Sequence, residues 1–500
     1  MRSVSLALSF AVSTTVLGLR YHPNLKPEHG PKVTRGIGSA DDISKACADI
    51  KSQISSASEV IDGVVEIGLA DDTHHWFFES NSETPTCIVE VGSPADVSIA
   101  MTVIGHYGSP FAIYCAGHAS NKGFSSTTGV HIALKRMNQI VLSADKSTVE
   151  IGTGNGWADV YDKLDGTGVN VVGGRVKGPG VGGFTLGGGY SWKTNQHGLT
   201  SDTVVQFNLV LPNGTISSAS AENNPDLFFA LKGGLNRFAV VTSAVFRTHP
   251  QTDEIYAGTT IYASDQVDAL LNATQVFSDT NTDPKAQIIT TINATPVGLS
   301  ALVLFFYDGP DPGTAFEMFD EVDDTISFVR VQSFSTFVSS VDSAIALNPR
   351  GTFNSLPTTK TTPAFLAAIK NQASQLNSQG HGALMLSYDI EPFLEYGEHA
   401  TESAYPHDES PLPLNLYFSW AFSSDDQYWN EAMVNAISEL REVAVREGIF
   451  NESSAVYPNY AIAGTTAEVL YGSANAARLR SIKANVDPNN VMSLAGGFNI

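Results

Sequence analysis

The segment from Tyr114 to Ser126 constrains this chain more than any other part of the sequence. It reads Tyr-Cys-Ala-Gly-His-Ala-Ser-Asn-Lys-Gly-Phe-Ser-Ser and follows a short apolar stretch, residues 111–113, that is typical of a strand. The small residues at positions 115–117 allow a tight turn whose backbone N–H groups can approach an anion. A lone histidine, His118, stands at the mouth of this turn. Glycine turns are common and most histidines are structural, so the segment alone indicates only a candidate anion site.

A second run of small residues strengthens this interpretation. Residues 173–189 read Gly-Gly-Arg-Val-Lys-Gly-Pro-Gly-Val-Gly-Gly-Phe-Thr-Leu-Gly-Gly-Gly. A segment with so few side chains exposes its backbone, which suits a large, flat, phosphorylated cofactor better than it suits a core. The two segments together predict a cofactor site.

With these segments the chain resembles the flavin-linked oxidases of the vanillyl-alcohol oxidase class, which have a PCMH-type FAD-binding domain, in the fungal type of the berberine-bridge-enzyme-like branch. The matching pieces run in order from about residue 80 to the C-terminus, whereas residues 256–455 match only loosely. They are Gly117-His118, Gly123-Phe124-Ser125-Ser126, Gly152-Thr153-Gly154 with Trp157, Val171-Val172-Gly173-Gly174-Arg175, residues 181–189, 224–228 and 232–234, Tyr457-Pro458-Asn459-Tyr460, and residues 486–491.

Composition narrows the possible partners. The 500 residues suffice for two or three domains with a large core, and the mean hydropathy of −0.02 is that of an ordinary soluble globular protein. The formal net charge is 28 − 51 = −23, and an acidic surface repels phosphate backbones. We therefore expect no nucleic-acid partner. Beyond the N-terminus no stretch is long and apolar enough to span a bilayer, so no membrane partner is expected either.

The N-terminus predicts secretion. Residues 1–19 begin with Met1-Arg2-Ser3 and continue with an apolar run, as in a secretory signal peptide, although a buried N-terminal helix is the alternative. Four Asn-x-Ser/Thr sequons, which also arise by chance, are candidate glycosylation sites: Asn213, Asn272, Asn293 and Asn451. The resemblance implies a disulfide between Cys47 and Cys87, with two buried free thiols as the alternative, and leaves Cys115 unpaired.

The fold class that we predict is α+β, a two-domain flavoprotein fold. Residues 40–60 read as a helix, short strands separated by glycine turns follow to about residue 250, and Pro225 starts a helix. From residue 256 apolar strands such as 300–307, 382–390 and 414–422 alternate with helices at 363–375 and 429–447, which suggests an antiparallel sheet covered by helices on one face. The predicted parts are a discontinuous FAD-binding domain at 20–255 (core about 80–252) and 456–500, and an inserted substrate-binding domain at 256–455.

The resemblance implies FAD linked covalently to His118. A turn histidine hydrogen-bonded to backbone is the alternative. The family usually has a basic residue followed by Ser or Gly where this chain has Tyr114, Cys115 and Ala116. Relatives with a second, cysteinyl link carry a cysteine in the 173–183 loop, and this chain has none there, so a single histidyl bond is predicted. Val181 matches the position that gates oxygen, where a small or β-branched residue resembles the oxidases.

The other cofactor-binding residues follow from the same resemblance. They are Cys115, Ala116, Gly117, Ala119, Ser120, Gly123, Phe124, Ser125, Gly174, Gly180, Val181, Gly182, Gly183, Leu186, Gly187, Gly188, Tyr190, Gly198, Val240 and Asn459.

Alcohol oxidation needs a base for the O–H proton while hydride passes to flavin N5. The resemblance favours Tyr457 as base with Tyr460 supporting it, and an unperturbed phenol must be ionised by a neighbouring charge or partner to serve. Glu391 is the alternative base, or a ligand for a substrate hydroxyl or amine. Asp389, which shares a face with Glu391 by strand alternation, and Tyr417 are weaker substrate candidates. Core aromatics and structural acids are the plain alternatives for these residues.

The resulting prediction is a secreted FAD-dependent oxidase of alcohols (sugar, benzylic or secondary-metabolite hydroxyls) that uses O2 and releases H2O2. An oxidative cyclase or dehydrogenase of a natural-product pathway, and a flavin-fold protein that only binds a ligand, remain open. No metal constellation is present in the sequence, and we expect a monomer with a small-molecule substrate.

Overall fold

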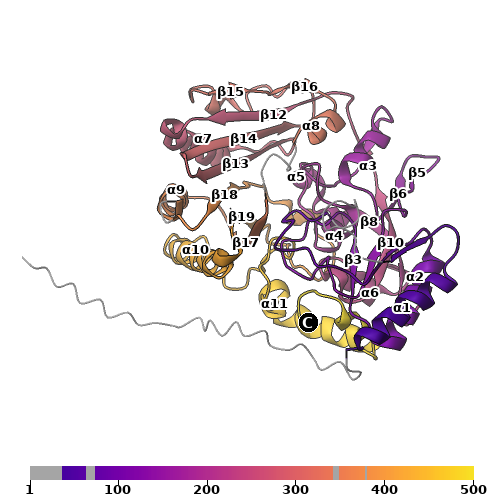
Figure 1. Cartoon of the computed structure of the whole chain (residues 1–500). Helices are drawn as coiled ribbons and strands as arrows, with labels where there is room; N and C mark the ends of the chain where they lie inside the picture. Colours follow the sequence, from indigo (N-terminus) through magenta and orange to yellow (C-terminus); the bar gives the residue numbers. More distant parts are fainter. Residues whose placement is uncertain (1–36, 63–73, 342–347, 378–379) are drawn as a thin grey trace, which may run out of the picture.

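The computed structural model describes residues 37–62, 74–341, 348–377 and 380–500, so the signal peptide predicted at 1–19 lies outside the described residues. Two lobes are visible in Figure 1: one holds two smaller sheets, and the other is built on one large sheet. This arrangement confirms the α+β, two-domain fold class. Within the described residues, no helix combines the length and apolarity that crossing a membrane requires.

We call the lobe with the two smaller sheets the flavin-type lobe. Its first sheet has the strand order β1-β2-β4-β3. Strands β2 (Cys87–Glu90), β4 (Val130–Ala133) and β3 (Phe111–Tyr114) are parallel, and β1 (Glu59–Asp62) is antiparallel to β2. Helices α1 (Ala40–Gln53) and α2 (Pro94–Tyr107) pack against each other beside this sheet.

Helix α1 begins at Ala40, as the sequence predicts, but it ends earlier than predicted. Its N-cap is Ser39, and Asp42 closes a capping box with it. The helix stops at Gln53, so the prediction of helix to residue 60 is wrong beyond that point. The backbone N–H of Ser55 donates to the Asp96 carboxylate instead of continuing the helix, at 2.8 Å. A competing side-chain acceptor thus ends the helix.

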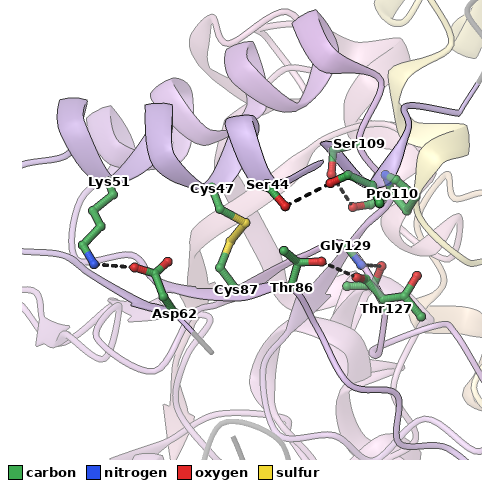
Figure 2. The surroundings of a disulfide bond; sticks show 12 residues. Ser44, Cys47, Lys51, Asp62, Thr86, Cys87, Ser109, Pro110, Thr127 and Gly129 are labelled. Atoms are coloured by element: carbon green, nitrogen blue, oxygen red, sulfur yellow. Dashed lines mark hydrogen bonds and ion pairs between the residues drawn. A yellow bond between two sulfur atoms is a disulfide. The ribbon is translucent and has the colours of Figure 1, made fainter. Parts of the chain in front are cut away.

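The predicted disulfide is confirmed. Cys47 on α1 bonds to Cys87 at the start of β2, with 6.1 Å between the Cα atoms (Figure 2). The bond fastens α1 to β2, which lies between β1 and β4 in the sheet, next to the ion pair between Lys51 and Asp62. Cys115 is the free cysteine of the described chain.

The second sheet is antiparallel and has the order β5-β6-β10-β8-β9. Short helices and a small two-stranded ladder connect and flank it. The bounds are β5 (Ile140–Leu142), β6 (Thr148–Gly152), α3 (Trp157–Leu164), β7 (Val169–Asn170), α4 (Val181–Leu186), α5 (Thr194–His197), β8 (Val204–Val210), β9 (Ile216–Ser220), α6 (Pro225–Leu231), β10 (Val240–Arg247) and β11 (His249–Pro250).

The large sheet is antiparallel, in the order β15-β12-β14-β13-β18-β19-β17, with β16 also paired to β12. Helices α7, α9 and α10 cover one face, as the sequence predicts, and lie on the left in Figure 1. The bounds are β12 (Ile255–Tyr262), α7 (Val267–Thr280), β13 (Ala286–Thr295), β14 (Gly298–Tyr307), β15 (Ile326–Ser327), β16 (Arg330–Gln332), α8 (Phe334–Ser340), β17 (Arg350–Thr358), α9 (Pro363–Asn377), β18 (Ala383–Ile390), β19 (Leu412–Trp420) and α10 (Asp426–Arg446).

The two faces of this sheet differ in character because successive side chains of a strand alternate. On β19, Leu416 and Phe418 belong to the apolar core beneath the helices, whereas Tyr417 belongs to an aromatic cluster on the other face. That other face looks toward the flavin-type lobe, since the Tyr417 ring lies 6.5 Å from the ring of Trp76, which stacks on His118.

The C-terminal segment returns to the flavin-type lobe. Helix α11 (Ala467–Val486) packs on α6, and Ala495 forms a bridge with Phe111 of β3. The buried guanidinium of Arg237 donates to the carbonyl of Ala495 at 3.0 Å. The amide of Asn121, in the turn after β3, donates to the carbonyl of Ala461 at 2.9 Å. These contacts bring Tyr457 and its neighbours next to the glycine-rich segments.

Candidate cofactor and active site

The turn after β3 forms a cradle of unused hydrogen-bond donors. Gly117 has φ of 66°, and a Cβ there would lie 2.2 Å from the carbonyl oxygen of His74, so a larger residue has no room. Within the described chain, the backbone N–H groups of residues 116–120 make no hydrogen bond. Buried or half-buried N–H groups without partners are costly unless a ligand satisfies them. Five such donors in sequence suit an anion such as pyrophosphate.

His118 is directed to the same cradle. Its side chain is half-buried, its Nε2 is buried without a hydrogen-bond partner, and its ring stacks on Trp76 with centroids 4.9 Å apart. Burial lowers the pKa of His118 to about 4, because the charged imidazolium loses its hydration. At neutral pH the ring is therefore uncharged and keeps a lone pair for bonding.

The glycine-rich run lies against this turn. A Cβ on Gly180 would be 2.3 Å from Sγ of Cys115, so the backbone at Gly180 lies directly against the Cys115 side chain and a larger residue has no room there. A Cβ on Gly183, in the first turn of α4, would meet no atom within 4 Å. The Cys115 thiol donates to the carbonyl of Thr153 at 2.5 Å, and burial raises its pKa to about 11. Cys115 is therefore a protonated, structural thiol.

These features fit FAD. The unused N–H groups suit its pyrophosphate, the open backbone at Gly183 leaves room for a flat ring system, and the unpartnered Nε2 of His118 suits a bond or contact to that ring. Within the described residues, no three His, Cys, Asp or Glu side chains are grouped as metal ligands.

The remaining residues predicted to bind the cofactor differ in which protein groups they contact. Ala119 accepts a hydrogen bond from Asn81 through its carbonyl, Ser125 accepts one from His75, and the Phe124 ring packs on Phe498. Other predicted positions are packed against protein atoms. At four glycines an added Cβ would lie close to a neighbouring side chain: Trp157 at Gly174, Asn459 at Gly187, Tyr457 at Gly188 and Asp202 at Gly198. Ser120 is buried. Three further positions are buried core residues: Val181, Leu186 and Val240.

Tyr457 has a phenol oxygen that accepts two N–H donors. The backbone N–H of Gly189 donates to it at 3.0 Å, and the Asn459 amide donates at 2.8 Å. Burial raises the pKa of Tyr457 to about 12, while these donors and the charge of Arg175 oppose the rise. Asn459 also donates to the carbonyl of Phe184, so its amide holds Tyr457 against α4.

A buried charged cluster lies beside Tyr457. Arg175 donates to both carboxylate oxygens of Glu391, at 2.5 and 3.0 Å, and to the hydroxyl of Tyr460 at 2.6 Å. The Tyr460 hydroxyl donates to Glu391 at 3.1 Å, and the rings of Tyr460 and Tyr457 are 4.9 Å apart. The cluster joins the glycine-rich run, the large sheet and the C-terminal segment. Sequence reasoning missed the role of Arg175, although the residue stands in the quoted Gly-Gly-Arg motif.

Tyr190 supports Tyr457 from behind. The two rings are 4.8 Å apart, and the Tyr190 hydroxyl lies 2.6 Å from that of Tyr396 and 3.2 Å from that of Tyr405. Tyr396 and Tyr405 belong to the connection between β18 and β19, residues 391–411, which we call the strap. A buried pair, His407 of the strap and Asp202 at 2.8 Å, ties it to the flavin-type lobe. No local motif marks these strap tyrosines, so sequence reasoning missed them.

The two weaker substrate candidates, Asp389 and Tyr417, lie on the face of the large sheet that looks toward the flavin-type lobe. Asp389 is half-buried, and its carboxylate accepts hydrogen bonds from Thr291 at 2.8 Å and Asn415 at 3.0 Å. Burial raises the pKa of Asp389, because the charged carboxylate loses hydration. The hydroxyl of Tyr417 donates to Asn348, and its ring stacks on Phe77.

The four sequons differ in accessibility. Asn213 and Asn272 are exposed. Asn451 is half-buried and donates to Glu409, and Asn293 is half-buried on β13, where it accepts a hydrogen bond from Ser387 at 2.9 Å.

Known proteins share both the sequence and the fold. Residues 85–220 match the family model of an FAD binding domain. The FAD-dependent monooxygenase drtC of Aspergillus calidoustus is 30% identical over 451 residues, which cover 85% of this chain and 84% of that protein. An uncharacterized FAD-linked oxidoreductase of Arthroderma benhamiae is 34% identical over 310 residues, 58% of this chain and 62% of that protein. The match thus spans less than two thirds of the Arthroderma protein.

Solved structures with this fold include the glucooligosaccharide oxidase from Acremonium strictum, with a TM-score of 0.74 and 21% identity over 89% of this chain and 97% of that chain. That structure is described as having 6-S-cysteinyl, 8α-N1-histidyl FAD. Berberine bridge enzyme in complex with (S)-reticuline has a TM-score of 0.71 and 17% identity, over 91% of this chain and 98% of that chain.

Proposed function

The chain belongs to the berberine-bridge-enzyme-like family of FAD-linked oxidoreductases with a PCMH-type FAD-binding domain, and on this premise we propose that it is a secreted oxidase of alcohols. FAD, when bound, supplies the acceptor for the substrate hydride. The disulfide between Cys47 and Cys87 supports secretion, because disulfides persist in oxidising compartments.

The environment of Tyr457 carries the proposal. A phenol takes the substrate hydroxyl proton only as its phenolate. Burial raises the pKa of Tyr457 to about 12, and two N–H donors on its oxygen favour the phenolate and oppose that rise. The positive charge of Arg175 acts in the same direction. Glu391 is the weaker candidate for the base, since Arg175 already occupies both of its carboxylate oxygens. In this proposal Tyr457 accepts the proton, and Arg175, Glu391 and Tyr460 hold the wall beside it.

Attachment of FAD through a single bond to His118 is the second part of the proposal. It is supported by the uncharged, unpartnered imidazole beside the cradle and by the lack of a cysteine in residues 173–183. The test is an acid-denaturing gel of the purified protein with His118→Ala alongside. Flavin fluorescence that stays on the wild-type band and leaves the variant supports the bond. Fluorescence on both bands, or on neither, contradicts it.

Peroxide release under air tests the oxidase. A panel of sugar, benzylic and phenolic alcohols is offered, and one H2O2 per O2 consumed is expected with an active alcohol. Flavin that an alcohol bleaches without air, but that air does not restore, indicates a dehydrogenase.

A second candidate function is monooxygenation, because the relative drtC bears that name. The two functions differ in the fate of oxygen. With ¹⁸O2, an oxidase places the label in H2O2, whereas a monooxygenase places one labelled atom in the product.

A further inference from the structure

Four polar side chains cross the large sheet in one line on the face that looks toward His118. Register pairs Thr291 of β13 with Asp389 of β18, Asp389 with Asn415 of β19, and Asn415 with Ser355 of β17. Cross-strand partners are about 5 Å apart, so the line spans four neighbouring strands. We call Thr291, Asp389, Asn415 and Ser355 the polar row.

Two of the four side chains in the polar row, Asn415 and Ser355, each have one buried oxygen atom without a hydrogen-bond partner in the described chain. The Asn415 amide donates to Asp389, which turns its carbonyl oxygen away, and that oxygen is buried without a partner. The Ser355 hydroxyl is likewise buried and without a partner. Asn415 is 6% exposed and Ser355 is 2% exposed. Leaving such groups unpaired costs free energy in the folded protein, so their retention indicates a ligand that satisfies them.

The charge of the polar row is also unbalanced. Arg175 compensates the charge of Glu391, the first residue after β18. Asp389, two residues earlier on the same face, forms no ion pair in the described parts of the chain; its partners are neutral hydroxyls and an amide. Asp389 is half-buried, and it lies on the same face of the sheet as Tyr417, the face that looks toward the flavin-type lobe. An acceptor carboxylate beside an unused carbonyl oxygen and a hydroxyl suits a ligand that is cationic and rich in N–H donors.

We propose that the polar row binds a protonated amino group of the substrate. The ammonium group donates to Asp389 and to the carbonyl of Asn415, with the Ser355 hydroxyl as a third acceptor. Residues two apart on a strand are separated by about 7 Å. The amino group therefore lies one short linker away from the carbon that reacts beside Glu391 and Tyr457. The inference rests on the proposed function, which it narrows to amino-alcohols.

Binding of a matched probe series to the flavin-loaded protein tests this inference without turnover. The probes are tyramine, tyrosol and 4-hydroxyphenylacetate, which share one ring and end in a cationic, a neutral and an anionic group at pH 7. Equilibrium dialysis without air measures their affinities. We expect tyramine to bind about tenfold more tightly than tyrosol, since a hydrogen bond to a charged group is the stronger kind, and 4-hydroxyphenylacetate to bind most weakly. Tyramine binding that is absent, or no tighter than that of tyrosol, overturns the proposal.

Three variants locate the effect. Asp389→Asn should bring the affinities for tyramine and tyrosol within about twofold of each other, as the charge is removed at nearly constant shape. Ser355→Ala should weaken tyramine binding while leaving the melting temperature unchanged or higher, because an unpaired buried hydroxyl is lost. Thr290→Val is the matched control on the opposite face, where Thr290 contacts Thr274 of α7, and it should keep the wild-type order of affinities.

The outcomes separate the two proposals. If Asp389→Asn does not fold, the affinities of the wild type and of Ser355→Ala for the probes still test the inference. If Ser355→Ala and Asp389→Asn both keep the wild-type order of affinities for the three probes, the polar row is not the binding site. Tyramine preference in a protein that releases no peroxide from any alcohol keeps the inference and removes the alcohol-oxidase function instead.

Discussion

The ion pair between Arg175 and Glu391 should be one of the strongest single links between the two lobes. Both side chains are almost fully buried, at 8% and 1% exposed, and two hydrogen bonds join them. Replacing Arg175 by methionine leaves an ionised carboxylate buried without its partner, and replacing Glu391 by leucine leaves an uncompensated guanidinium. Removing one member of a buried pair costs about 3–5 kcal/mol. We expect a loss of that size in the free energy of unfolding of each single variant.

The double variant Arg175→Met/Glu391→Leu is the decisive comparison. It removes both charges and keeps apolar volume, so its cost should fall well below the sum of the two single costs. A coupling energy of about 3 kcal/mol is expected, because in each single variant much of the loss comes from the stranded charge. Urea unfolding followed by tryptophan fluorescence measures all four proteins of the cycle.

An exposed pair supplies the control for this cycle. Arg478 contacts Asp226 and Glu402 with a side chain that is 34% exposed, and Arg478→Met should cost less than about 1 kcal/mol. Single-variant costs at Arg175 and Glu391 no larger than that of Arg478→Met, or a double variant whose cost equals the sum, would refute the reasoning.

Three further predictions concern the site and the stability of the fold. Tyr457→Phe should slow flavin reduction by about 10²–10⁴-fold, which is the usual contribution of a general base, whereas Tyr460→Phe, which keeps Tyr457, should slow it less. Stopped-flow spectroscopy without air measures both rates. Equal rates of flavin reduction in the wild type and Tyr457→Phe would exclude Tyr457 as the base. Burial lowers the pKa of His197 to about 3 and that of His249 to about 4. The unfolded chain therefore takes up protons first as the pH falls below about 6.5, and the free energy of unfolding should decrease from there toward pH 3. Unfolding curves measured across this pH range should show a smaller decrease for His249→Gln than for the wild type. Cys47→Ser opens a link across 40 residues and should lower the free energy of unfolding by about 4 kcal/mol, and dithiothreitol should destabilise the wild type but not this variant.

Local signals in the sequence predicted much of the fold. Pro225 starts α6 as expected, the strand predicted at 300–307 lies within β14, and the helix predicted at 363–375 lies within α9. Each of these elements has its signal within a few residues, such as a proline at a first helical turn or an apolar run. The ends were less predictable. The strand predicted at 414–422 runs from Leu412 to Trp420, because pairing with β17 and β18 sets its limits.

The candidate site divides in the same way. The turn at 115–126 and the run at 173–189 could be recognised because a backbone that approaches an anion needs small residues at close spacing. The partners of the side chains could not be recognised. Arg175 and Glu391 are 216 positions apart, and the strap tyrosines that back Tyr457 carry no motif of their own.

The sequence by itself determined the family, the cofactor cradle and the residue types available for chemistry, since these depend on backbone conformations that neighbouring residues impose. Only the tertiary structure decided which groups act together. Sheet register aligned Asp389 with Asn415 and Ser355, and the returning C-terminal segment brought Tyr457 to the donors of Gly189 and Asn459. Contacts of this kind depend on how strands and loops from distant parts of the chain pack, and the periodicity of a single strand says which face a residue occupies but not what lies opposite.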